Sequence, residues 1–372
     1  MGFPVLAELE TGVETAGTAA DAMRLNLLLR TANRVLCEVG SFRAQTAEHL
    51  YRHIFRLPWE AFIPPAGYLT VTSFVRTAAI SDSRFANLKC KDAIADRIRR
   101  KKGQRPDSGS ERTGAVVFLY WNDTECKVYL DTSGDSLSRR GYRKIPLDAP
   151  MQETLAAAVA LATGWNGEGN FVNPMCGSGT LAIEAALMGL GRAPGLYRDD
   201  FGFMHLLGFG EPAWKAARAE AKAIPRRTLT GRIIATDIRP EAVEAAKANA
   251  RTAGVEQHIQ FAVCDFAETP IPEGGGVVVL NPEYGERMGT AASLEPLYRR
   301  IGDFFKQRCL GYTGYVFTGS ADLAKKVGLR GRRRMRFFNG PIECRLLSFE
   351  LYAGTRRQRP ANGIELTESE GA

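Results

Sequence analysis

The amino-acid sequence predicts an α/β protein whose main part is a doubly wound, mostly parallel sheet that ends in an antiparallel hairpin. From about Asn170 onward, short apolar strands alternate with helical segments, a pattern typical of parallel βαβ units. The last two expected strands, at 334–338 and 344–351, are separated by only a short turn. Parallel neighbours need a long crossover connection, so these two strands must pair antiparallel. A smaller α+β region is expected before residue 150, where strand-like segments accompany a helix.

The N-terminal half divides into two small units at a proline-rich segment, 59–67, that we expect to be a linker. The expected elements are a strand at 4–9, helices at 19–31 and 46–55, strands at 68–75, 115–120 and 127–131, a helix at 89–102, and an Ala-rich helix at 152–162. Ile94 and Ile98 recur at helical spacing in the third of these helices. The pattern predicts one unit at 1–65 and a second at 66–148.

The C-terminal half is expected to form one larger unit at 149–356. Its first five strands are predicted at 170–173, 232–236, 259–263, 277–280 and 315–318. An extra segment at about 192–227, with an aromatic stretch and a helix near Trp214, separates the first two of these strands. The tail at 357–372 is polar, and we expect it to be disordered.

The composition favours a reduced protein with an anionic partner. The formal net charge of +8 favours phosphate, because clustered Lys and Arg gain affinity through counterion release. The seven cysteines are scattered, without the paired spacing of zinc sites. No apolar run reaches the length of a membrane span, and no signal core follows the N-terminus. We therefore expect a cytoplasmic protein without structural metal or a membrane partner, and the oligomeric state stays open.

The strongest local motif is a glycine-containing loop between a strand and a helix. It comprises Asn173, Pro174, Met175, Cys176, Gly177, Ser178, Gly179 and Thr180. The glycines permit positive φ and let a ligand approach the backbone, while the N-terminus of the following helix offers free N–H groups. Such a loop can hold the carboxylate and sugar of a cofactor. The alternative is a tight strand-to-helix turn without a ligand.

Two acidic residues follow the next two strands of the sheet. Asp237 ends the strand at 232–236 and is placed to accept hydrogen bonds from ribose hydroxyls, with Ile238 beside it. Asp265, which Phe266 follows, is similarly placed for an adenine amino group. A helix cap is the alternative role of Asp237, and the two roles are compatible.

Asn281, Pro282, Glu283 and Tyr284 follow an apolar strand, at the ligand-binding edge of an open sheet. The Asn281 side-chain oxygen and the Pro282 carbonyl can accept hydrogen bonds from one exocyclic amine, aiming its lone pair at a methyl group. Tyr284 offers a ring face to a flipped base, a stacking contact of about 1–3 kcal/mol. With the glycine loop and two acids upstream, the motif predicts methyl transfer in a pocket that Asn281 shares with the cofactor. A proline-terminated strand followed by a turn is the alternative.

These residues resemble those of the THUMP-domain class I RNA methyltransferases, in particular the bacterial group that methylates guanine N2 in large-subunit ribosomal RNA. The resemblance covers nearly the whole chain and includes RTANRVL at 30–36, KCKDAIADRI at 89–98, RGYRK at 140–144, FGFMHLLG at 201–208 and NGPIECRL at 339–346. It implies a ferredoxin-like N-terminal part, a THUMP RNA-binding domain, and a Rossmann-like class I methyltransferase domain that uses S-adenosyl-L-methionine.

Three features depart from the family pattern. Asn173 stands where the family usually has Asp, so it can hydrogen-bond the cofactor but cannot form an ion pair with its ammonium group. Glu283 stands where the family has the second proline of Asn-Pro-Pro-Tyr, which loosens the backbone and adds a charge near the target amine. The chain also begins about where the family's first strand and helix should have passed, so we expect a partial ferredoxin-like domain.

Two basic clusters are candidates for RNA contact. The first follows the helix at 89–102 and comprises Lys89, Lys91, Arg97, Arg99, Arg100, Lys101, Lys102 and Arg105. The second lies near the last hairpin and comprises Lys325, Lys326, Arg330, Arg332, Arg333, Arg334 and Arg336. A solvated helix face is the alternative for the first cluster, whereas the second is expected to neutralise phosphates beside the active site.

The leading function is guanine-N2 methylation of ribosomal RNA, with guanine in tRNA as the nearest alternative. An Asn-Pro-x-Tyr motif serves any planar amine or amide, so N6-adenine methylation and methylation of a protein glutamine stay open. Asn173 and Glu283 together also leave open a catalytically silent RNA-binding or assembly factor.

Overall fold

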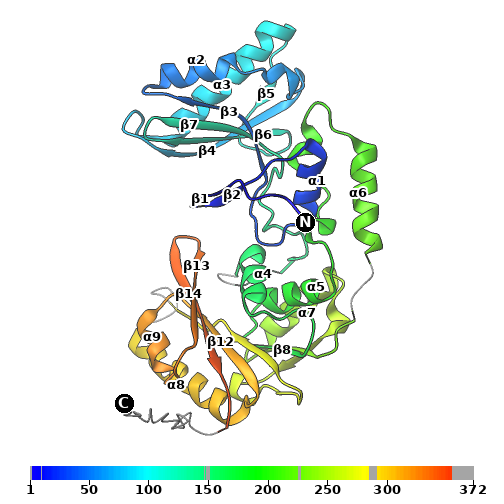
Figure 1. Ribbon diagram of the computed structural model, residues 1–372, viewed down its shortest axis with the longest axis vertical. Coiled ribbons are helices and arrows are strands. Elements are labelled where there is room, and N and C mark those ends of the chain that lie inside the picture. The colour runs from blue at the N-terminus through cyan, green and yellow to red at the C-terminus, as the bar shows by residue number, and fades with distance from the viewer. Residues whose placement is uncertain are drawn as a thin grey trace, which may run out of the picture.

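The computed structural model describes residues 2–9, 11–145, 147, 151–224, 228–284 and 291–353. Figure 1 shows three parts along the long axis of the molecule: a helix-backed sheet at the top, a small hairpin and helix in the middle, and a larger sheet at the bottom. The tail at 357–372 lies outside the described residues. No helix of the described part is both long and apolar enough to cross a membrane.

The middle part begins with an antiparallel hairpin of β1 (Ala7–Leu9) and β2 (Gly12–Glu14). The helix α1 (Ala19–Leu28) starts with a capping box, in which the Thr18 hydroxyl accepts from the N–H of Asp21. The Asp21 carboxylate in turn accepts from the N–H of Thr18 at 2.9 Å. This reciprocal cap gives partners to two N–H groups that a helix end would otherwise leave without them.

The upper part is a five-stranded sheet in the order β3-β7-β6-β4-β5. Its strands are β3 (Leu36–Arg43), β4 (Tyr68–Arg76), β5 (Asp107–Ser108), β6 (Ala115–Asn122) and β7 (Glu125–Asp131). The helices α2 (Ala47–Arg56) and α3 (Ser83–Lys102) cover one face of the sheet, with the short η1 (Trp59–Ala61) beside them. Leu119, Trp121 and Val128 are wholly buried in the core between sheet and helices.

The boundary expected between residues 65 and 66 cuts through this sheet. The strand β3 precedes it, yet β3 pairs antiparallel with β7 of the same sheet. A bulge between Glu38 and Gly40 shifts the register of β3 and breaks its alternation, which is why the sequence pattern did not predict a strand there. The expected linker at 59–67 instead contains η1, whose Trp59 is buried and donates its Nε1–H to the Ile54 carbonyl at 2.7 Å. The unit therefore runs from β3 to β7.

The lower part is a seven-stranded sheet in the order β10-β9-β8-β11-β12-β14-β13. Its strands are β8 (Asn170–Pro174), β9 (Ile233–Asp237), β10 (Ile259–Val263), β11 (Gly276–Leu280), β12 (Tyr312–Thr318), β13 (Arg333–Asn339) and β14 (Ile342–Glu350). The strands β8 to β12 pair parallel, whereas β14 pairs antiparallel with both β12 and β13. The predicted fold class, a mostly parallel sheet with a terminal hairpin, is confirmed.

Helices cover both faces of this sheet. Alternate residues of β11 face the two layers: Val277 and Val279 belong to one apolar cluster, Val278 and Leu280 to the other. The helices α4 (Glu153–Ala162), α5 (Thr180–Gly189) and α7 (Pro240–Thr252) pack on the first face, and α8 (Ala291–Arg308) and α9 (Ala321–Lys326) on the second. A strand with two buried faces is apolar throughout, which explains why residues 277–280 of β11 are all apolar.

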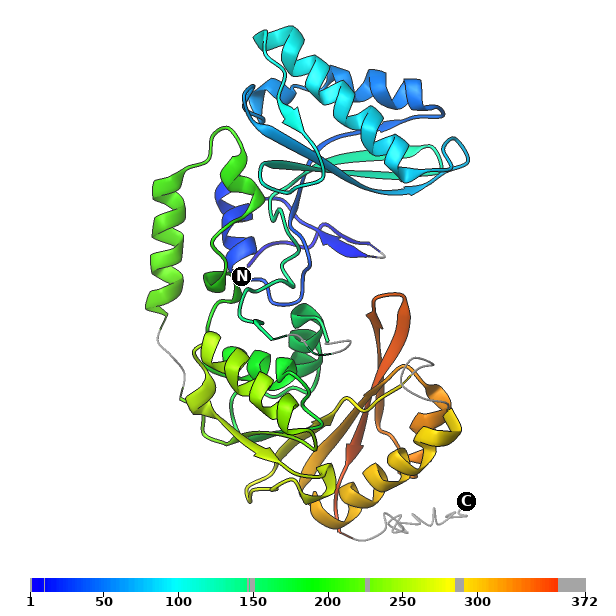
Figure 2. The ribbon, with the colours of Figure 1, turned by 180° about the vertical axis from the view of Figure 1, so that it is seen from behind.

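The segment between α5 and β9 packs on the N-terminal helix. It contains η2 (Pro194–Tyr197), η3 (Gly202–His205) and α6 (Glu211–Ala223). The Trp214 ring lies 5.2 Å from the Phe201 ring and 5.0 Å from the Phe203 ring. These rings share one buried cluster with Met23 and Leu27 of α1, and Figure 2 shows α6 beside α1. The extra segment of the lower unit therefore completes the middle part.

Candidate active site at the carboxyl edge of the large sheet

The structure brings the glycine loop and the Asn281 segment to one edge of the large sheet. The strands β8 and β11 are parallel neighbours, so the loop after Pro174 and the segment after Leu280 leave the sheet at the same end. The turn of the β13–β14 hairpin lies at this end too, because Thr318, the last residue of β12, pairs with Arg345 near that turn. Figure 1 shows this end of the sheet facing the middle part of the molecule.

The glycine loop has the backbone geometry that its sequence predicts. Met175, Gly177 and Gly179 all have positive φ, of 56°, 55° and 81°. At Gly179 an added Cβ would lie 2.8 Å from the Cβ of Ala246 on α7, so glycine is needed there for close helix packing as well as for its φ. At Gly177 an added Cβ would meet nothing within 4 Å, so the loop has open space on this side.

Asp237 holds the glycine loop in place. One of its carboxylate oxygens accepts from the N–H of Gly177 at 2.9 Å, and the other accepts from the N–H of Arg239 at 3.1 Å. The helix-cap alternative does not describe this arrangement, since Arg239 itself is the N-cap of α7. Each oxygen keeps a second lone pair for a ligand hydroxyl. Ile238, next in sequence, exposes 65% of its surface and can contact an apolar group.

Three other predicted cofactor residues of the loop are buried. Burial and the nearby Asp237 carboxylate raise the pKa of Cys176 well above its usual value, so its thiol stays protonated. The Thr180 hydroxyl accepts from Arg143 at 3.1 Å, and the Ser178 carbonyl accepts from the Asn249 amide at 3.1 Å. Hydrogen bonds from Arg143 and Asn249 therefore brace the loop at Thr180 and Ser178.

Arg143 and Asn249 support the glycine loop, a role that the sequence did not predict for them. The Asn249 side chain also accepts from the N–H groups of Lys144 and Ile145, at 2.8 and 3.1 Å. It thus ties the 140–144 motif to the glycine loop. Arg143 carries an ion pair with Glu153 at 3.3 Å. The RGYRK motif was the available signal, but only the fold shows that it supports this loop.

Two asparagine oxygens at the edge are buried without partners. The Asn173 side chain donates to the Val279 carbonyl at 2.9 Å, which joins the ends of β8 and β11, but its Oδ1 has no partner in the described part of the chain. The Oδ1 of Asn281 also has none there. A buried carbonyl oxygen without a hydrogen bond is costly, so each is a candidate for contact with a ligand.

Residues of the β13–β14 hairpin hold the Tyr284 side chain in place. Its phenolic oxygen accepts from the Asn339 amide at 3.0 Å and from the Cys344 thiol at 3.5 Å. Its ring meets Phe317 edge-on at 6.2 Å, and an added Cβ at Gly319 would lie 2.9 Å from the ring. Asn339 and Cys344 belong to the NGPIECRL motif, so this motif fixes the orientation of a predicted catalytic residue.

Asp265 and Phe266, which follow β10 at the far side of β9, have different surroundings. Burial alone would raise the pKa of Asp265, but hydrogen bonds from the Ala267 N–H and the Arg300 guanidinium outweigh it and lower the pKa. Both of these contacts use Oδ1, so Oδ2 is the acceptor offered to an amine. The Phe266 side chain is buried against Phe304 and can serve a cofactor only through its backbone.

The basic residues of α3 are mostly paired with carboxylates. Arg97 donates two hydrogen bonds to Glu60, at 2.9 and 2.6 Å, so its guanidinium is not available for the predicted RNA contact. The other pairs are Lys89 with Glu48, Lys91 with Asp92, Arg99 with Asp96, and Arg105 with Asp92 and Asp96. Arg100 lies over the Phe55 ring. Five of the eight predicted cations therefore have ion pairs within the described ranges, whereas Arg100, Lys101 and Lys102 have none there.

The basic residues of the hairpin are less constrained. Arg333 and Arg334 are exposed on the edge strand β13, whereas Arg332 pairs with Glu350. No group of three or more metal-ligating side chains occurs within the described ranges. All seven cysteines are free thiols.

Solved structures identify the class to which this fold belongs. SMU.472 complexed with SAH matches with a TM-score of 0.84 at 27% identity, over 95% of this chain and 93% of its own. A predicted N6-adenine-specific DNA methylase from Listeria monocytogenes matches with a TM-score of 0.79 at 30% identity, over 94% of this chain and 90% of its own. The chain has the fold of the class I S-adenosylmethionine-dependent methyltransferases.

The family follows from the sequence matches. Residues 140–348 match the RMKL-like methyltransferase domain, 44–131 the THUMP domain, and 1–36 the RlmL ferredoxin-like domain. The chain belongs to the RMKL-like methyltransferase family.

Two relatives show how much of this architecture is shared. Ribosomal RNA large subunit methyltransferase K/L of Syntrophotalea carbinolica is 38% identical over 382 residues, covering 100% of this chain but 53% of its own length. The protein slr0064 of Synechocystis sp., provisionally named an RNA methyltransferase, is 36% identical over 341 residues, covering 92% of this chain and 89% of its own. The chain thus spans about half the length of the K/L relative.

Proposed function

We propose that this protein transfers a methyl group from S-adenosylmethionine to the exocyclic N2 of a guanine in 23S ribosomal RNA. The observation that carries the proposal is the buried Oδ1 of Asn281, which has no hydrogen-bond partner among the described residues. It lies at the same sheet edge as the glycine loop, and the Tyr284 ring, held by Asn339, follows it in sequence. The relatives named as ribosomal RNA large subunit methyltransferases support this choice of substrate.

The residues present fit S-adenosylmethionine. The open side of Gly177 gives room for the cofactor against the backbone, and the N-terminus of α5 offers N–H groups to its carboxylate. Asp237 would accept from the ribose hydroxyls, Ile238 would contact the adenine, and Asp265 would accept from its amino group. Asn173 offers a neutral oxygen where a carboxylate is usual, which still accepts a hydrogen bond from an ammonium group.

Asn281 and Pro282 would position the target amine. Each can accept one of its two hydrogens, through a side-chain oxygen and a backbone carbonyl, and this fixes the direction of the nitrogen lone pair. Tyr284 would stack on the flipped base. The cofactor supplies an electrophilic methyl group on a sulfonium. When bound, it would pass this methyl to the amine nitrogen as its carbon–sulfur bond breaks, with one amine proton going to water. What the residues of this chain must supply is therefore alignment more than a strong base.

N6-adenine methylation is the second candidate. The amine site does not itself distinguish guanine N2 from adenine N6, since both are planar exocyclic amines. The named N6-adenine-specific DNA methylase from Listeria monocytogenes also shares this fold at 30% identity. The separate RNA-binding domain favours RNA over DNA as the substrate.

The test is to incubate the protein with methyl-labelled cofactor and unmodified 23S ribosomal RNA or tRNA, then digest the RNA and identify the labelled nucleoside. We expect label in N2-methylguanosine from ribosomal RNA. Label only in adenosine would overturn the guanine assignment, and label only from tRNA would overturn the ribosomal one. Calorimetry with S-adenosylmethionine separates these results from a silent RNA-binding factor, which would bind no cofactor.

A further inference from the structure

One face of the upper sheet is covered by no helix of the described ranges. The helices α2 and α3 pack on the opposite face, where Leu119, Trp121 and Val128 are buried. Because side chains alternate along a strand, Phe118 and Tyr120 of β6 and Tyr129 of β7 point away from the helices. Phe74 of β4 joins them, since it pairs in register with Tyr120. We call these four side chains the aromatic face.

The rings of the aromatic face form two neighbouring pairs. Phe74 and Tyr120 are stacked, with ring centroids 5.3 Å apart and planes within 11° of each other. Phe118 and Tyr129 are directly opposed on β6 and β7, with centroids 6.3 Å apart. Burial raises the pKa of Tyr129 to about 12, so its hydroxyl remains a hydrogen-bond donor at neutral pH.

Phe74 is the outer ring of the Phe74–Tyr120 stack, and it is exposed to solvent. On the side of β4 away from β6, β5 pairs only with Tyr68 and Leu69, so within the described ranges no strand lies beside Phe74. Phe74 exposes 48% of its surface although it is a large apolar residue. A further flat ring placed against Phe74 would extend the stack by one member, and every nucleobase offers such a ring.

Cations border the aromatic face on β4 and β7, and one carboxylate, that of Glu38 on β3, lies opposite Tyr129. Arg76 follows Phe74 by two residues on the same side of β4, is exposed, and has no ion pair with another described residue. Lys127 stands opposite Tyr120 on β7, where Glu38 partly neutralises it at 3.6 Å. This arrangement suits a strand of RNA, whose bases stack while its phosphates lie near cations.

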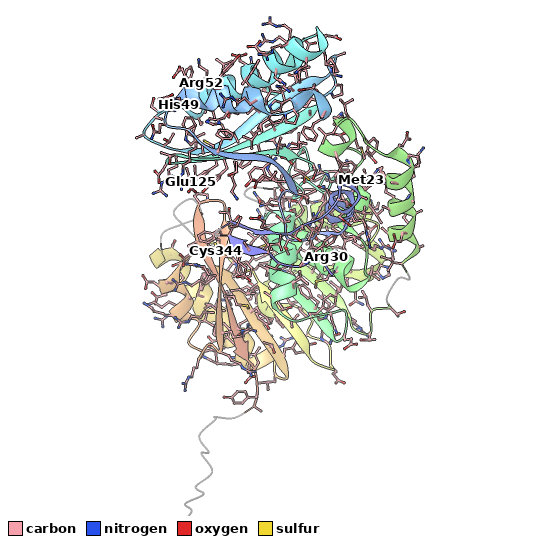
Figure 3. The ribbon with its side chains drawn as sticks, turned by 45° about the horizontal axis from the view of Figure 1, so that its top comes forward. Met23, Arg30, His49, Arg52, Glu125 and Cys344 are labelled. Atoms are coloured by element: carbon pink, nitrogen blue, oxygen red, sulfur yellow. The ribbon has the colours of Figure 1, made fainter. Side chains whose placement is uncertain are left out.

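The aromatic face is turned toward the rest of the molecule. Figures 1 and 2 both show the helix layer on the outside of the upper sheet and the opposite face toward the β1–β2 hairpin and the large sheet. Figure 3 shows His49 and Arg52 on the outer helix α2. The carboxyl edge of the large sheet faces the same middle region. RNA held on the aromatic face is therefore on the active-site side of the upper unit.

We propose that the aromatic face binds unpaired nucleotides of the RNA substrate, with one base stacked on Phe74 and a phosphate beside Arg76. The proposal rests on the proposed function only in taking RNA as the substrate. It assigns RNA binding to the uncovered face, whereas the paired cations of α3 lie on the other.

The test compares binding of two labelled RNAs by the full chain: an oligouridylate, which stays unpaired, and an RNA duplex of the same length. We expect Phe74→Ala to weaken binding of the oligouridylate by about 5- to 100-fold, and the duplex by much less. Phe74→Trp should restore the affinity. Arg76→Gln should lower the slope of log affinity against log salt by about 0.7, the change expected when one phosphate of a single strand is no longer neutralised.

Phe85 provides a matched control, since it exposes 44% of its surface but lies on α3. Phe85→Ala should leave both affinities unchanged. An unaltered oligouridylate affinity in Phe74→Ala, or an equal loss in Phe85→Ala, would overturn the proposal while leaving the methyltransferase function intact. If the unmodified chain does not bind the oligouridylate, the proposal also fails, while the methyl-transfer assay with ribosomal RNA still decides the proposed function. Circular dichroism of each variant checks that the fold is retained.

Discussion

Asn281 is the residue on which the proposed amine site depends most, because its Oδ1 is buried without a partner in the described part of the chain. We expect Asn281→Ala to lower kcat for methyl transfer by about 100-fold, since a misaligned amine loses most of the benefit of positioning. The affinity for S-adenosylmethionine should change much less. Rapid-quench assays with labelled cofactor give kcat, and calorimetry gives the affinity. Asn166→Ala, in an exposed turn before β8, is the control and should keep full activity.

Two substitutions of Tyr284 can separate the contribution of base stacking from that of its hydrogen bonds. Burial raises the pKa of Tyr284 well above its usual value, so its phenol stays neutral and its titration should leave no step in a pH profile near neutrality. Tyr284→Ala removes the ring and should raise the KM for RNA by about 5- to 100-fold. Tyr284→Phe keeps the ring but removes the hydrogen bonds with Asn339 and Cys344, so it should cost several-fold at most. Equal effects of the two variants would contradict a stacking role.

The motif residues could be predicted because each motif directly follows, in sequence, the strand that positions it. The glycine loop follows its strand directly, and Asn281 follows Leu280. The partner of Arg97 could not be predicted in this way, because Glu60 lies 37 residues away and is brought beside it by the packing of η1 on α3. The same holds for Asn339, which reaches Tyr284 across 55 residues.

Among the elements, η1 and α3 are joined by the Glu60–Arg97 pair. Hydrogen bonds from Arg97 hold the pKa of Glu60 below its usual value of 4.5. The pair therefore stabilises the fold above that pH, and its contribution is lost as the pH falls through the lower, folded-state pKa. Glu60→Gln should lower the free energy of unfolding by about 1 kcal/mol at pH 7. Urea titrations from pH 7 downward should show the difference between the two proteins shrinking as the pH falls below 4.5.

The hairpin makes a separate contribution to RNA binding. Arg333→Glu with Arg334→Glu should weaken binding of ribosomal RNA fragments and lower the salt slope by about 1 for each phosphate that the two arginines neutralise. Arg332 is a poorer choice for this test, because its pairing with Glu350 makes reversal at that site a change in the fold as well. Anisotropy titrations over a series of salt concentrations measure the slope. An unchanged slope would count against the hairpin as a phosphate site.

Strands were predictable where the apolar or alternating pattern is unbroken. The expected strand at 277–280 came within one residue of β11, which is buried on both faces, and the one at 259–263 has the bounds of β10, a partly exposed edge strand. The edge strand β3 has only partly buried or exposed residues and a bulge, so no period survives in its sequence. Prolines in 59–67 suggested a linker, but the buried Trp59 of η1 fixes that segment to the core.

For the whole molecule, the sequence predicted the order of the units but not how they are joined. The structure does not divide into two units at residue 65. The strand β3, which precedes this position, pairs with β7, which follows it, so both belong to one sheet. Likewise, the aromatic stretch near Trp214 showed that something is inserted into the large unit, but its partner, α1, lies almost two hundred positions earlier.

The packing of α6 on α1 predicts that the middle and lower parts unfold together. Leu27, 1% exposed, lies in the cluster with Phe201 and Trp214. We expect Leu27→Ala to lower the free energy of unfolding by about 2–5 kcal/mol. Hydrogen exchange should show faster opening of α6 as well as of α1. Faster exchange confined to α1 would contradict this coupling.

Because α6, which lies between α5 and β9 in the chain, packs on α1, fragments of this protein should behave differently with and without α1. A polypeptide starting near residue 140 would retain every strand of the large sheet, yet the side of α6 that packs against Met23 and Leu27 would be left against water. Such a fragment should self-associate or recruit chaperones, whereas one that keeps α1 should remain monodisperse. Which fragments of this protein can fold alone is therefore decided by buried packing between distant segments, and not by the order of the domains along the chain.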